Sequence, residues 1–209
     1  MSGKVITVAQ QKGGSGKTTV AANLAVAFNR AGHSVAVLDT DPQGSLGRWY
    51  MARREAGRPG IEFSTASAWG VGYECEKLKR AHDWVVIDTP PKADADLRPA
   101  IREADLVLIP VAASKVDVWA TEAVLDLAER AGKPVLIVLN RAKSGTRVLE
   151  DVKAALDELD APRAGVTLGN RVAYAETLGQ GLGIVERGRG AWMAEINGLA
   201  DEVARVVAV

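Results

Sequence analysis

One glycine-rich stretch near the amino terminus constrains the fold of this chain more than any other part of the sequence. An apolar run, residues 5–9, precedes it, and an amphipathic run, residues 20–31, follows it. This order predicts a strand, a tight turn and a helix, which is the setting in which a loop binds phosphate. The stretch reads Gln10-Gln11-Lys12-Gly13-Gly14-Ser15-Gly16-Lys17-Thr18-Thr19.

The residues of this loop suit an anion that carries several phosphates. Glycines let the backbone approach phosphate oxygens at places where a Cβ would clash, and the helix N-terminus adds N–H donors. We expect Lys17 to contact the β- and γ-phosphates and the Thr18 hydroxyl to bind Mg²⁺. The predicted nucleotide-binding residues of the loop are Lys12, Gly13, Gly14, Ser15, Gly16, Lys17, Thr18 and Thr19.

Two later apolar runs end in aspartate. Residues 34–38 lead into Asp39-Thr40-Asp41-Pro42-Gln43-Gly44, and residues 84–87 lead into Asp88. Acidic residues at the carboxyl ends of buried strands lie where open α/β sheets bind ligands. Taken alone, the first pattern favours an exposed turn with two carboxylates, and the second is common among buried strands. Downstream of the glycine-rich loop, both favour a site for Mg²⁺ and for the water that attacks a phosphate.

The glycine-rich loop departs from the common form G-x-x-x-x-G-K-[ST]. Gln11 stands where that form has glycine, and Lys12 is an additional lysine. With the two aspartate motifs in this order, the chain resembles the deviant Walker A ATPases of the ParA/MinD family over nearly its whole length. It is most similar to the small ParA-type members, which lack an extra DNA-reading domain.

The resemblance implies a role for each charged residue of the site. Lys12 would be the signature lysine, which reaches the nucleotide of the partner subunit in an ATP-dependent homodimer. Asp41 would orient the attacking water, and Asp39 would support the water or the Mg²⁺ network. Asp88 would hold Mg²⁺ together with Thr18. The implied catalytic set is therefore Lys12, Lys17, Asp39 and Asp41.

Further positions follow from the same resemblance. The strand predicted at residues 134–139 ends at Asn140 and Arg141, where the family often contacts adenine. An asparagine can offer both a donor and an acceptor to a base edge. The loop after the strand predicted at residues 105–111 resembles a dimer-interface segment of the family. Lys115 and Asp117 are its interface candidates.

Apolar runs alternate with helical patterns along the whole chain. Six strands are expected, at residues 5–9, 34–38, 61–66, 84–87, 105–111 and 134–139. This alternation predicts a doubly wound, mostly parallel α/β sheet with helices on both faces, as in P-loop NTPases. At 209 residues the chain fits a single domain, 1–209, with room for a full core.

Composition limits the partners and the compartment. Lysine and arginine total 26 and aspartate and glutamate total 26, so no overall basic field favours nucleic acid. The single cysteine, Cys75, excludes a disulfide within the chain and is expected to be a core or half-buried residue. No apolar run approaches the ~18 residues of a membrane span, and residues 1–4 lead directly into the first strand. We expect a cytoplasmic protein, which by the resemblance associates with the nucleoid when ATP is bound.

Local basic residues supply the only support in the sequence for a DNA-binding face. Residues 45–58 predict a helix with an apolar and a basic face, which a solvated surface explains adequately. The carboxyl-terminal third adds scattered arginines, which by charge alone are equally well solubilising. By the resemblance, they would bind DNA without sequence preference. The DNA-binding candidates are Arg163, Arg171, Arg187 and Arg189.

The function implied by the resemblance is an ATPase cycle that needs ATP and Mg²⁺. The ATP-bound dimer would bind DNA, and a ParB-like or cargo adaptor would stimulate hydrolysis and release it. Such cycles position plasmids, chromosomes or protein cargo. A MinD-like membrane protein is one alternative, but the acidic last helix, residues 191–207, opposes it because membrane-surface helices are basic. A metabolic ATP-dependent ligase, such as a dethiobiotin-synthetase-like enzyme, is the other.

Overall fold

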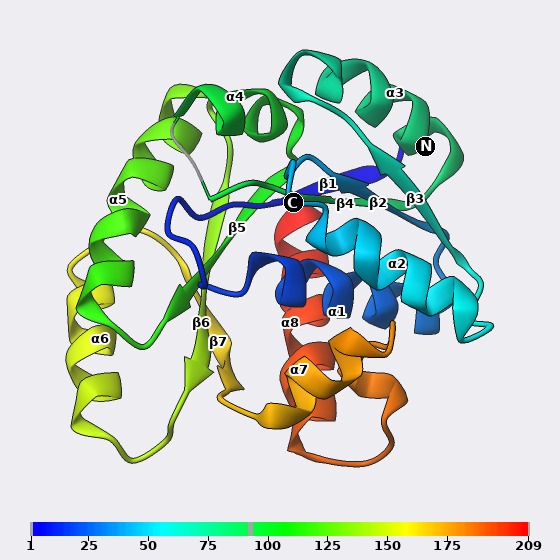
Figure 1. The fold of residues 1–209 in the computed structure, drawn as a ribbon. Helices are drawn as coiled ribbons and strands as arrows, with labels where there is room; N and C mark the ends of the chain where they lie inside the picture. The colour runs from blue at the N-terminus through cyan, green and yellow to red at the C-terminus, as the bar shows by residue number, and fades with distance from the viewer. Residues whose placement is uncertain (1, 92–93, 209) are drawn as a thin grey trace.

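The computed structural model describes residues 2–91 and 94–208. Within these residues, seven strands form one parallel sheet in the order β3-β2-β4-β1-β5-β6-β7 (Figure 1). The predicted doubly wound α/β class is confirmed, and the sheet is parallel throughout. The strands are β1 (Lys4–Val8), β2 (Val35–Asp39), β3 (Ile61–Thr65), β4 (Trp84–Asp88), β5 (Leu106–Ala112), β6 (Val135–Ala142) and β7 (Arg163–Gly169).

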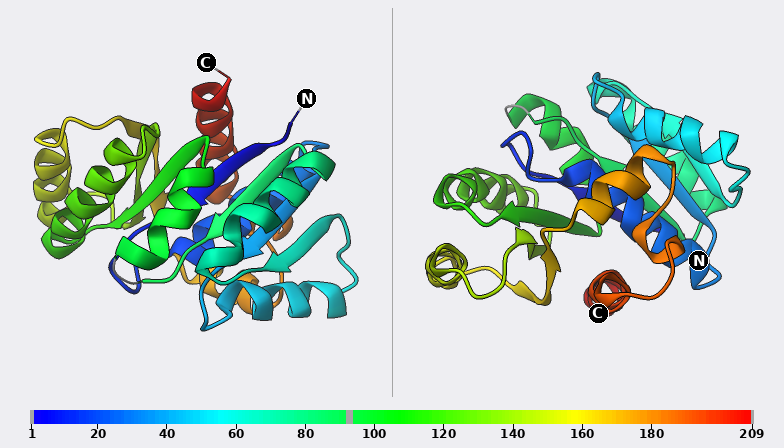
Figure 2. Two further views of the ribbon diagram at one scale, coloured as in Figure 1. Left: turned by 90° about the horizontal axis from the view of Figure 1, so that it is seen from above. Right: turned by 60° about the horizontal axis from the view of Figure 1, so that its bottom comes forward.

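Helices cover both faces of the sheet (Figure 2). One layer contains α1 (Lys17–Arg30), α2 (Ser45–Glu55), α7 (Val172–Gly179) and α8 (Ala191–Val207). The other contains α3 (Val71–Ala81), α4 (Asp94–Glu103), α5 (Lys115–Arg130) and α6 (Arg147–Asp157). Short 3₁₀ turns stand at η1 (Ala68–Gly70) and η2 (Ile184–Glu186). Among the described helices, none is both long enough and apolar enough to cross a membrane.

The continuous apolar runs in the sequence follow from this double cover. Every residue of β2 and β4 is buried, because both faces of these strands pack against helices. Along β4, Trp84 and Val86 pack toward the α1 layer, whereas Val85 and Ile87 pack toward the α3 layer. Cys75 is fully buried in the α3 layer, as expected.

Three elements, α6, β7 and α7, were not predicted from the sequence. Strand β7 contains two glycines and only two buried residues, so it lacks the apolar pattern of the central strands. Its position depends on α8: the backbone N–H groups of Gly165 and Val166 donate to the Glu202 carboxylate at 2.8 and 3.0 Å. Because a carboxylate of a distant helix holds this strand, its own sequence lacks the run of apolar residues from which a buried strand is predicted.

The register of the central strands gathers the predicted motifs at one edge of the sheet. Val8 at the end of β1 pairs with Asp88 of β4, and Asp88 pairs with Asp39 of β2. The loops that follow these three strands therefore begin side by side. Strand β1 lies between β4 and β5, which places the glycine-rich loop in the crevice where α/β sheets bind ligands.

Candidate nucleotide-binding site

The glycine-rich loop adopts a backbone that two of its glycines make possible. Gly14 and Gly16 have φ angles of 82° and 91°, in the left-handed region that side chains disfavour. Gly16 is also the N-cap residue of α1, and a Cβ there would lie 2.3 Å from Nδ2 of Asn140. Glycine is therefore required at position 16 for its conformation and for the close approach of β6.

Lys17 is a buried cation without a carboxylate partner. It is the first residue of α1 and only 6% exposed, and its Nζ lies 3.4 Å from the carbonyl oxygen of Lys12. Burial lowers the pKa of Lys17, although the carboxylates of Asp88 and Asp41 oppose this shift. Within the described residues, no acidic group lies within ion-pair distance of its ammonium. An anionic phosphate in the loop would supply the missing counter-charge.

Thr18 and Asp88 form the second part of the site. The Thr18 hydroxyl donates to Oδ2 of Asp88 at 2.6 Å, and the other oxygen, Oδ1, is buried without a hydrogen-bond partner among the residues that the structure describes. Burial raises the pKa of Asp88 to about 7, and the nearby Asp39 carboxylate adds to the shift. A buried carboxylate oxygen without a donor is costly, and a cation would satisfy it.

These two residues fit a Mg²⁺ ion of the kind that accompanies nucleotides. The described residues contain no group of three or more histidine, cysteine or acidic side chains arranged to hold a metal alone. Nucleotide-bound Mg²⁺ does not need such a group, because phosphates and water supply most of its ligands. Thr18 and Asp88 would supply the protein ligands, as their pattern predicts.

Asp39 has a structural role that the sequence pattern did not reveal. Its Oδ1 accepts the backbone N–H of Asp41, and its Oδ2 accepts the backbone N–H of Gly47, both at 3.0 Å. Burial raises the pKa of Asp39, while these two hydrogen bonds lower it, and the net shift is upward. Asp39 thus ties the loop after β2 to the start of α2. Its part in a water or Mg²⁺ network stays a prediction.

Asp41 lies at the mouth of the site. Its Oδ1 accepts the backbone N–H of Gln43 at 2.9 Å, which fixes the turn, and the residue remains half exposed. Asp41 borders an open hollow of about 250 Å³. Its water-orienting role stays a prediction, but it stands on the same hollow as the phosphate loop. The hollow is lined by Gly14, Gly16, Lys17, Thr18, Thr19, Asp41, Gln43, Ser45, Pro91, Arg141 and Leu178.

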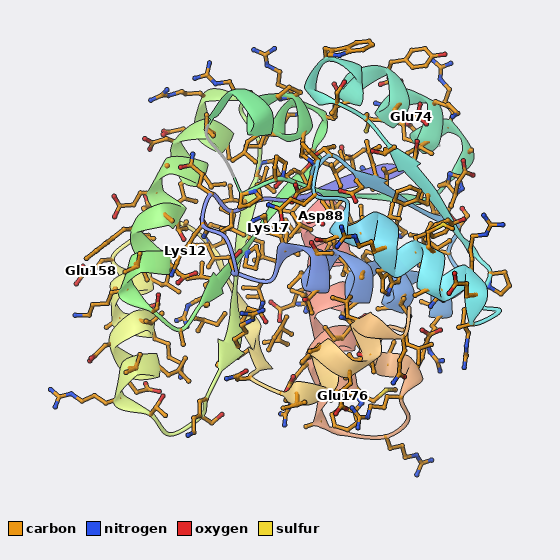
Figure 3. All side chains as sticks on the ribbon, viewed as in Figure 1. Lys12, Lys17, Glu74, Asp88, Glu158 and Glu176 are labelled. Atoms are coloured by element: carbon orange, nitrogen blue, oxygen red, sulfur yellow. The ribbon has the colours of Figure 1, made fainter. Side chains whose placement is uncertain are left out.

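The side chain of Lys12 points toward α5 and away from the Lys17 ammonium (Figure 3). Its Nζ is 2.5 Å from Oδ2 of Asp117 and 3.4 Å from Oγ of Ser114. The side chain of Lys12 is 36% exposed, whereas that of Asp117 is 3% exposed. The structure thus joins the predicted signature lysine to a predicted interface residue of the same chain, while Lys115 lies exposed nearby.

Asn140 and Arg141 stand where β6 passes the loop. Nδ2 of Asn140 donates to the carbonyl oxygen of Ser15 at 2.8 Å, and Oδ1 accepts the backbone N–H of Arg141 at 2.9 Å. One donor and one acceptor site of the amide remain available, so a contact with a base is chemically feasible. Arg141 is exposed and has a φ of 53°, which is uncommon outside glycine. Adenine contacts by both residues stay predictions.

Three of the four arginines predicted to bind DNA are paired with carboxylates of the same chain. Arg163 pairs with Asp157 at 2.6 Å, Arg171 pairs with Glu195 at 2.5 Å, and Arg187 pairs with Glu176. Arg163 begins β7 and Arg171 follows its end, so roughly 20 Å of strand separates them at ~3.3 Å per residue. Only Arg189 among the four is exposed without an ion pair in the described part of the chain.

The basic face predicted for residues 45–58 needs one correction. Arg53 is 3% exposed and forms a buried ion pair with Glu186, so it does not belong to the solvated face. Leu46 and Trp49 are also buried, and the spacing of the three residues places them on one side of the helix. This helical spacing was the available signal, and the charge of Arg53 obscured it.

The amino-acid sequence is similar to one family of nucleotide-binding domains and to several of its members. Residues 6–184 match the profile of the CobQ/CobB/MinD/ParA nucleotide-binding domain. The chain is 30% identical over 212 residues to a maintenance of carboxysome distribution protein A from Halothiobacillus neapolitanus, with 95% of each chain covered. It is also 30% identical over 148 residues to a chromosome partitioning protein ParA from Caulobacter vibrioides, covering 52% of this chain and 55% of that one.

Solved structures share the fold at lower identity. The apo form of McdA from Cyanothece superimposes with a TM-score of 0.82 at 18% identity, covering 96% of this chain and 99% of that chain. MinD from Pyrococcus horikoshii, solved with Mg-ADP, superimposes with a TM-score of 0.81 at 21% identity, covering 96% and 95%. These likenesses confirm the architecture that places the loop at the carboxyl edge of the sheet.

Proposed function

Because this chain belongs to the CobQ/CobB/MinD/ParA family of nucleotide-binding proteins, we propose that it is a Mg²⁺-dependent ATPase that positions a cargo in the cell. One observation carries the ATPase proposal: unpartnered charge is buried beside the glycine-rich loop. Lys17 has no counter-ion there, and Oδ1 of Asp88 has no donor within the described residues. A nucleoside triphosphate with Mg²⁺ satisfies both groups at once.

Each residue of the site has a task in this reaction. The loop N–H groups and the Lys17 ammonium bind the phosphates and stabilise the charge that develops during transfer. Thr18 and Asp88 would hold Mg²⁺, which when bound would neutralise charge on the phosphates. Asp41 orients the attacking water, and Asp39 fixes the backbone that carries Asp41.

Lys12 would act between two copies of the chain. Its ammonium is paired with Asp117 in the single chain and is 36% exposed. In an ATP-dependent homodimer, Lys12 would exchange this carboxylate for the phosphates of the partner's nucleotide. The exchange replaces one charge-assisted contact by another, so its free-energy cost is modest.

The cargo is proposed from the relative that matches nearly the whole chain. That relative is named for the distribution of carboxysomes, so a large protein assembly is our first candidate cargo. An adaptor on the cargo would stimulate hydrolysis, and the ATP-bound dimer would bind DNA without sequence preference. The apolar face of α8 packs against the sheet and α1, which leaves it unavailable for a membrane surface.

Asp41→Ala tests this cycle, with Gln43→Ala as the matched control on the same loop. We expect Asp41→Ala to bind ATP and Mg²⁺ normally but to lose at least about 100-fold in turnover. Gln43→Ala, which changes another side chain at the rim of the same hollow, should lose far less turnover. The ATP-bound variant should then sediment with random-sequence DNA and not with anionic liposomes.

Three results would overturn parts of the proposal. Substantial turnover by Asp41→Ala would move the water-orienting role to another residue. Liposome binding without DNA binding would favour the MinD-like alternative. Turnover that requires a small-molecule substrate and ignores DNA would favour the ligase alternative.

A further inference from the structure

Helix α2 connects directly to the loop that carries Asp41. The helix begins at Ser45, and the backbone N–H of Gly47 in its first turn donates to Asp39. Asp39 in turn accepts the backbone N–H of Asp41. Any displacement of α2 would therefore shift Asp41 relative to the phosphate loop.

Arg53 fastens the far end of α2 to the carboxyl-terminal part of the chain. Its Nη1 and Nη2 donate to Oε2 and Oε1 of Glu186 at 2.8 and 3.1 Å, and Nη1 also donates to the carbonyl oxygen of Gly181 at 3.2 Å. The guanidinium lies 5.6 Å from the centre of the Trp49 ring. Both charged side chains are almost fully buried, at 3% and 6% exposure.

The segment that receives Arg53, residues 181–186, fits closely against α2; we call it the strap. Nε1 of Trp49 donates to the carbonyl oxygen of Leu182 at 3.3 Å. A Cβ on Gly181 would lie 2.1 Å from the backbone nitrogen of Arg53, so the two backbones approach to a distance that only glycine allows. Glu186 also closes the strap on itself by accepting the N–H of Gly183 at 2.9 Å.

The same strap holds α1, the helix that follows the phosphate loop (Figure 1). The backbone N–H of Ile184 donates to Oδ1 of Asn23 at 2.6 Å, and Nδ2 of Asn23 donates to the carbonyl oxygen of Thr19 at 2.8 Å. A Cβ on Gly183 would lie 2.6 Å from Cβ of Val26. The strap therefore contacts both helices that begin at the nucleotide site.

We propose that the Arg53–Glu186 pair is a positioning element for ATP hydrolysis, which sets the distance between Asp41 and the phosphate loop by clamping α1 and α2 to one strap. This proposal rests on the proposed ATPase function. Lys17 and Thr18 belong to α1, and Asp41 is tied to α2 through Asp39. The strap therefore connects the residues that would bind the phosphates with the residue that would orient the water. Neither Arg53 nor Glu186 lines the hollow that would hold the nucleotide.

The chemistry of the pair favours positioning over simple stabilisation. Burying two charges costs desolvation, and apolar residues of the same volume are often as stable or more stable. Nε of Arg53 is buried and has no hydrogen-bond partner in the described part of the chain, which adds to that cost. A bidentate guanidinium–carboxylate pair instead fixes orientation as well as distance. That property suits a contact that must hold one helix in register with another.

Arg53→Lys and Glu186→Gln test the proposal, with Arg54→Lys as the matched control. Arg54 is the next residue of α2 and is exposed, without an ion pair in the described residues. We expect both clamp variants to lose about 10- to 100-fold in kcat while ATP affinity changes less than about twofold. The control should match the wild-type protein in both quantities. An unchanged kcat, or an equal loss of kcat and ATP affinity, would overturn the proposal.

Hydrogen exchange gives a readout that needs neither ATP nor turnover. In the nucleotide-free protein, the amides of Asp41 and Gly47 should exchange faster in the clamp variants than in the control, because their acceptor Asp39 no longer holds a fixed α2. Unchanged exchange at these amides would contradict the clamp even if the wild-type chain hydrolysed no ATP. An inactive wild-type chain with the expected exchange would contradict only the ATPase function.

Discussion

The phosphate-loop region and the carboxyl-terminal arginine region differ in whether their charged side chains have ion-pair partners. In the first, Lys17 and Asp88 are buried with no ion-pair partner among residues 2–91 and 94–208. Burial lowers the pKa of Lys17 and raises that of Asp88, so it favours the neutral form of each group. In the second, Arg163, Arg171 and Arg187 each lie against a carboxylate of the same chain. The charges of the first region are free to bind a ligand, and their burial costs free energy. The arginines of the second region are already paired with carboxylates of the same chain.

This difference separates ligand sites from structural ion pairs. An unpaired buried charge destabilises the folded chain, so it persists where a ligand compensates for it. A paired arginine contributes to the fold and must give up its carboxylate before it binds a phosphate. Counting arginines in the sequence cannot distinguish the two cases, because the partners Asp157, Glu176 and Glu195 come from other elements.

The largest expected effect is on the loop. Lys17→Ala should lower ATP affinity by about 100-fold or more, because it removes the cation that holds the phosphates. It should leave the free energy of unfolding of the nucleotide-free protein unchanged or slightly higher, since Lys17 is desolvated and unpaired. Calorimetric ATP titration and chemical denaturation measure the two quantities. A large loss of stability without ATP would show that Lys17 is structural.

Glu195→Gln should give the opposite pattern, a loss of stability without a loss of ATP affinity. The Glu195 carboxylate accepts hydrogen bonds from Arg171, from the backbone of Gly169 and from the Tyr174 hydroxyl. We expect the free energy of unfolding to fall by about 2 kcal/mol. A matched change at an unpaired acid, Glu55→Gln on the exposed face of α2, should leave stability within about 0.5 kcal/mol.

The pH dependence of this effect has a definite sign. Burial raises the pKa of Glu195, but the hydrogen bonds from its three partners outweigh burial and leave the pKa lowered. A lowered pKa means that Glu195 stabilises the fold above its unfolded pKa and that this contribution is lost as pH falls through the folded value. Wild type and Glu195→Gln should therefore converge in stability at acidic pH. A constant difference down to acid pH would contradict this account.

Lys12 is intermediate between the two regions, because its ammonium is paired with Asp117 but remains partly exposed. We therefore expect an intermediate effect from Lys12→Ala. ATP binding to the single chain should persist, because Lys12 points toward Asp117 rather than into the loop. ATP-dependent dimerisation and turnover should fall about tenfold or more, because the lysine's proposed target lies on the partner subunit. Sedimentation with ATP and a turnover assay test this. A variant that dimerises and turns over normally would remove the signature-lysine role.

The smallest expected effect is on DNA binding by the paired arginines. Replacing Arg163 and Arg171 together with alanine should weaken binding of the ATP-bound protein to random-sequence DNA by less than about tenfold, because each must first leave a carboxylate. Replacing Arg48 and Arg54 of α2, which are exposed and form no ion pair with the described residues, gives the matched comparison. Salt titrations of both variants measure how many phosphate contacts each pair makes. A larger effect at Arg163 and Arg171 would show that their ion pairs open on DNA.

The sequence predicted the parts of the molecule that depend on local pattern. The strands ending at Asp39 and Asp88 are there, and parallel pairing in register brings both aspartates to the loop. Backbone geometry explains this success: β-strand pattern, glycine conformation and helix start are local properties. The roles of Asn140 and Asp117 as contacts of the loop needed the fold, because β6 and α5 meet the loop only in three dimensions.

The features that could not be predicted rest on contacts between distant segments. The helix predicted at residues 45–58 gave no sign that Arg53 is buried, because arginine is rarely buried and its partner Glu186 lies 133 residues further along the chain. Strand β7 escaped prediction because its backbone is held by carboxylates of α8. In both cases a charged side chain that would normally be solvated on the surface instead forms a specific contact with a distant segment.

Strand β7 also decides how copies of this chain can associate. It is an outer strand of the sheet, and such strands can recruit a second chain through their unpaired backbone. Here the N–H groups of Gly165 and Val166 are occupied by Glu202, and that of Gly169 by Glu195. An incoming strand would find these donors already engaged, so continuous sheets across molecules are disfavoured along this edge.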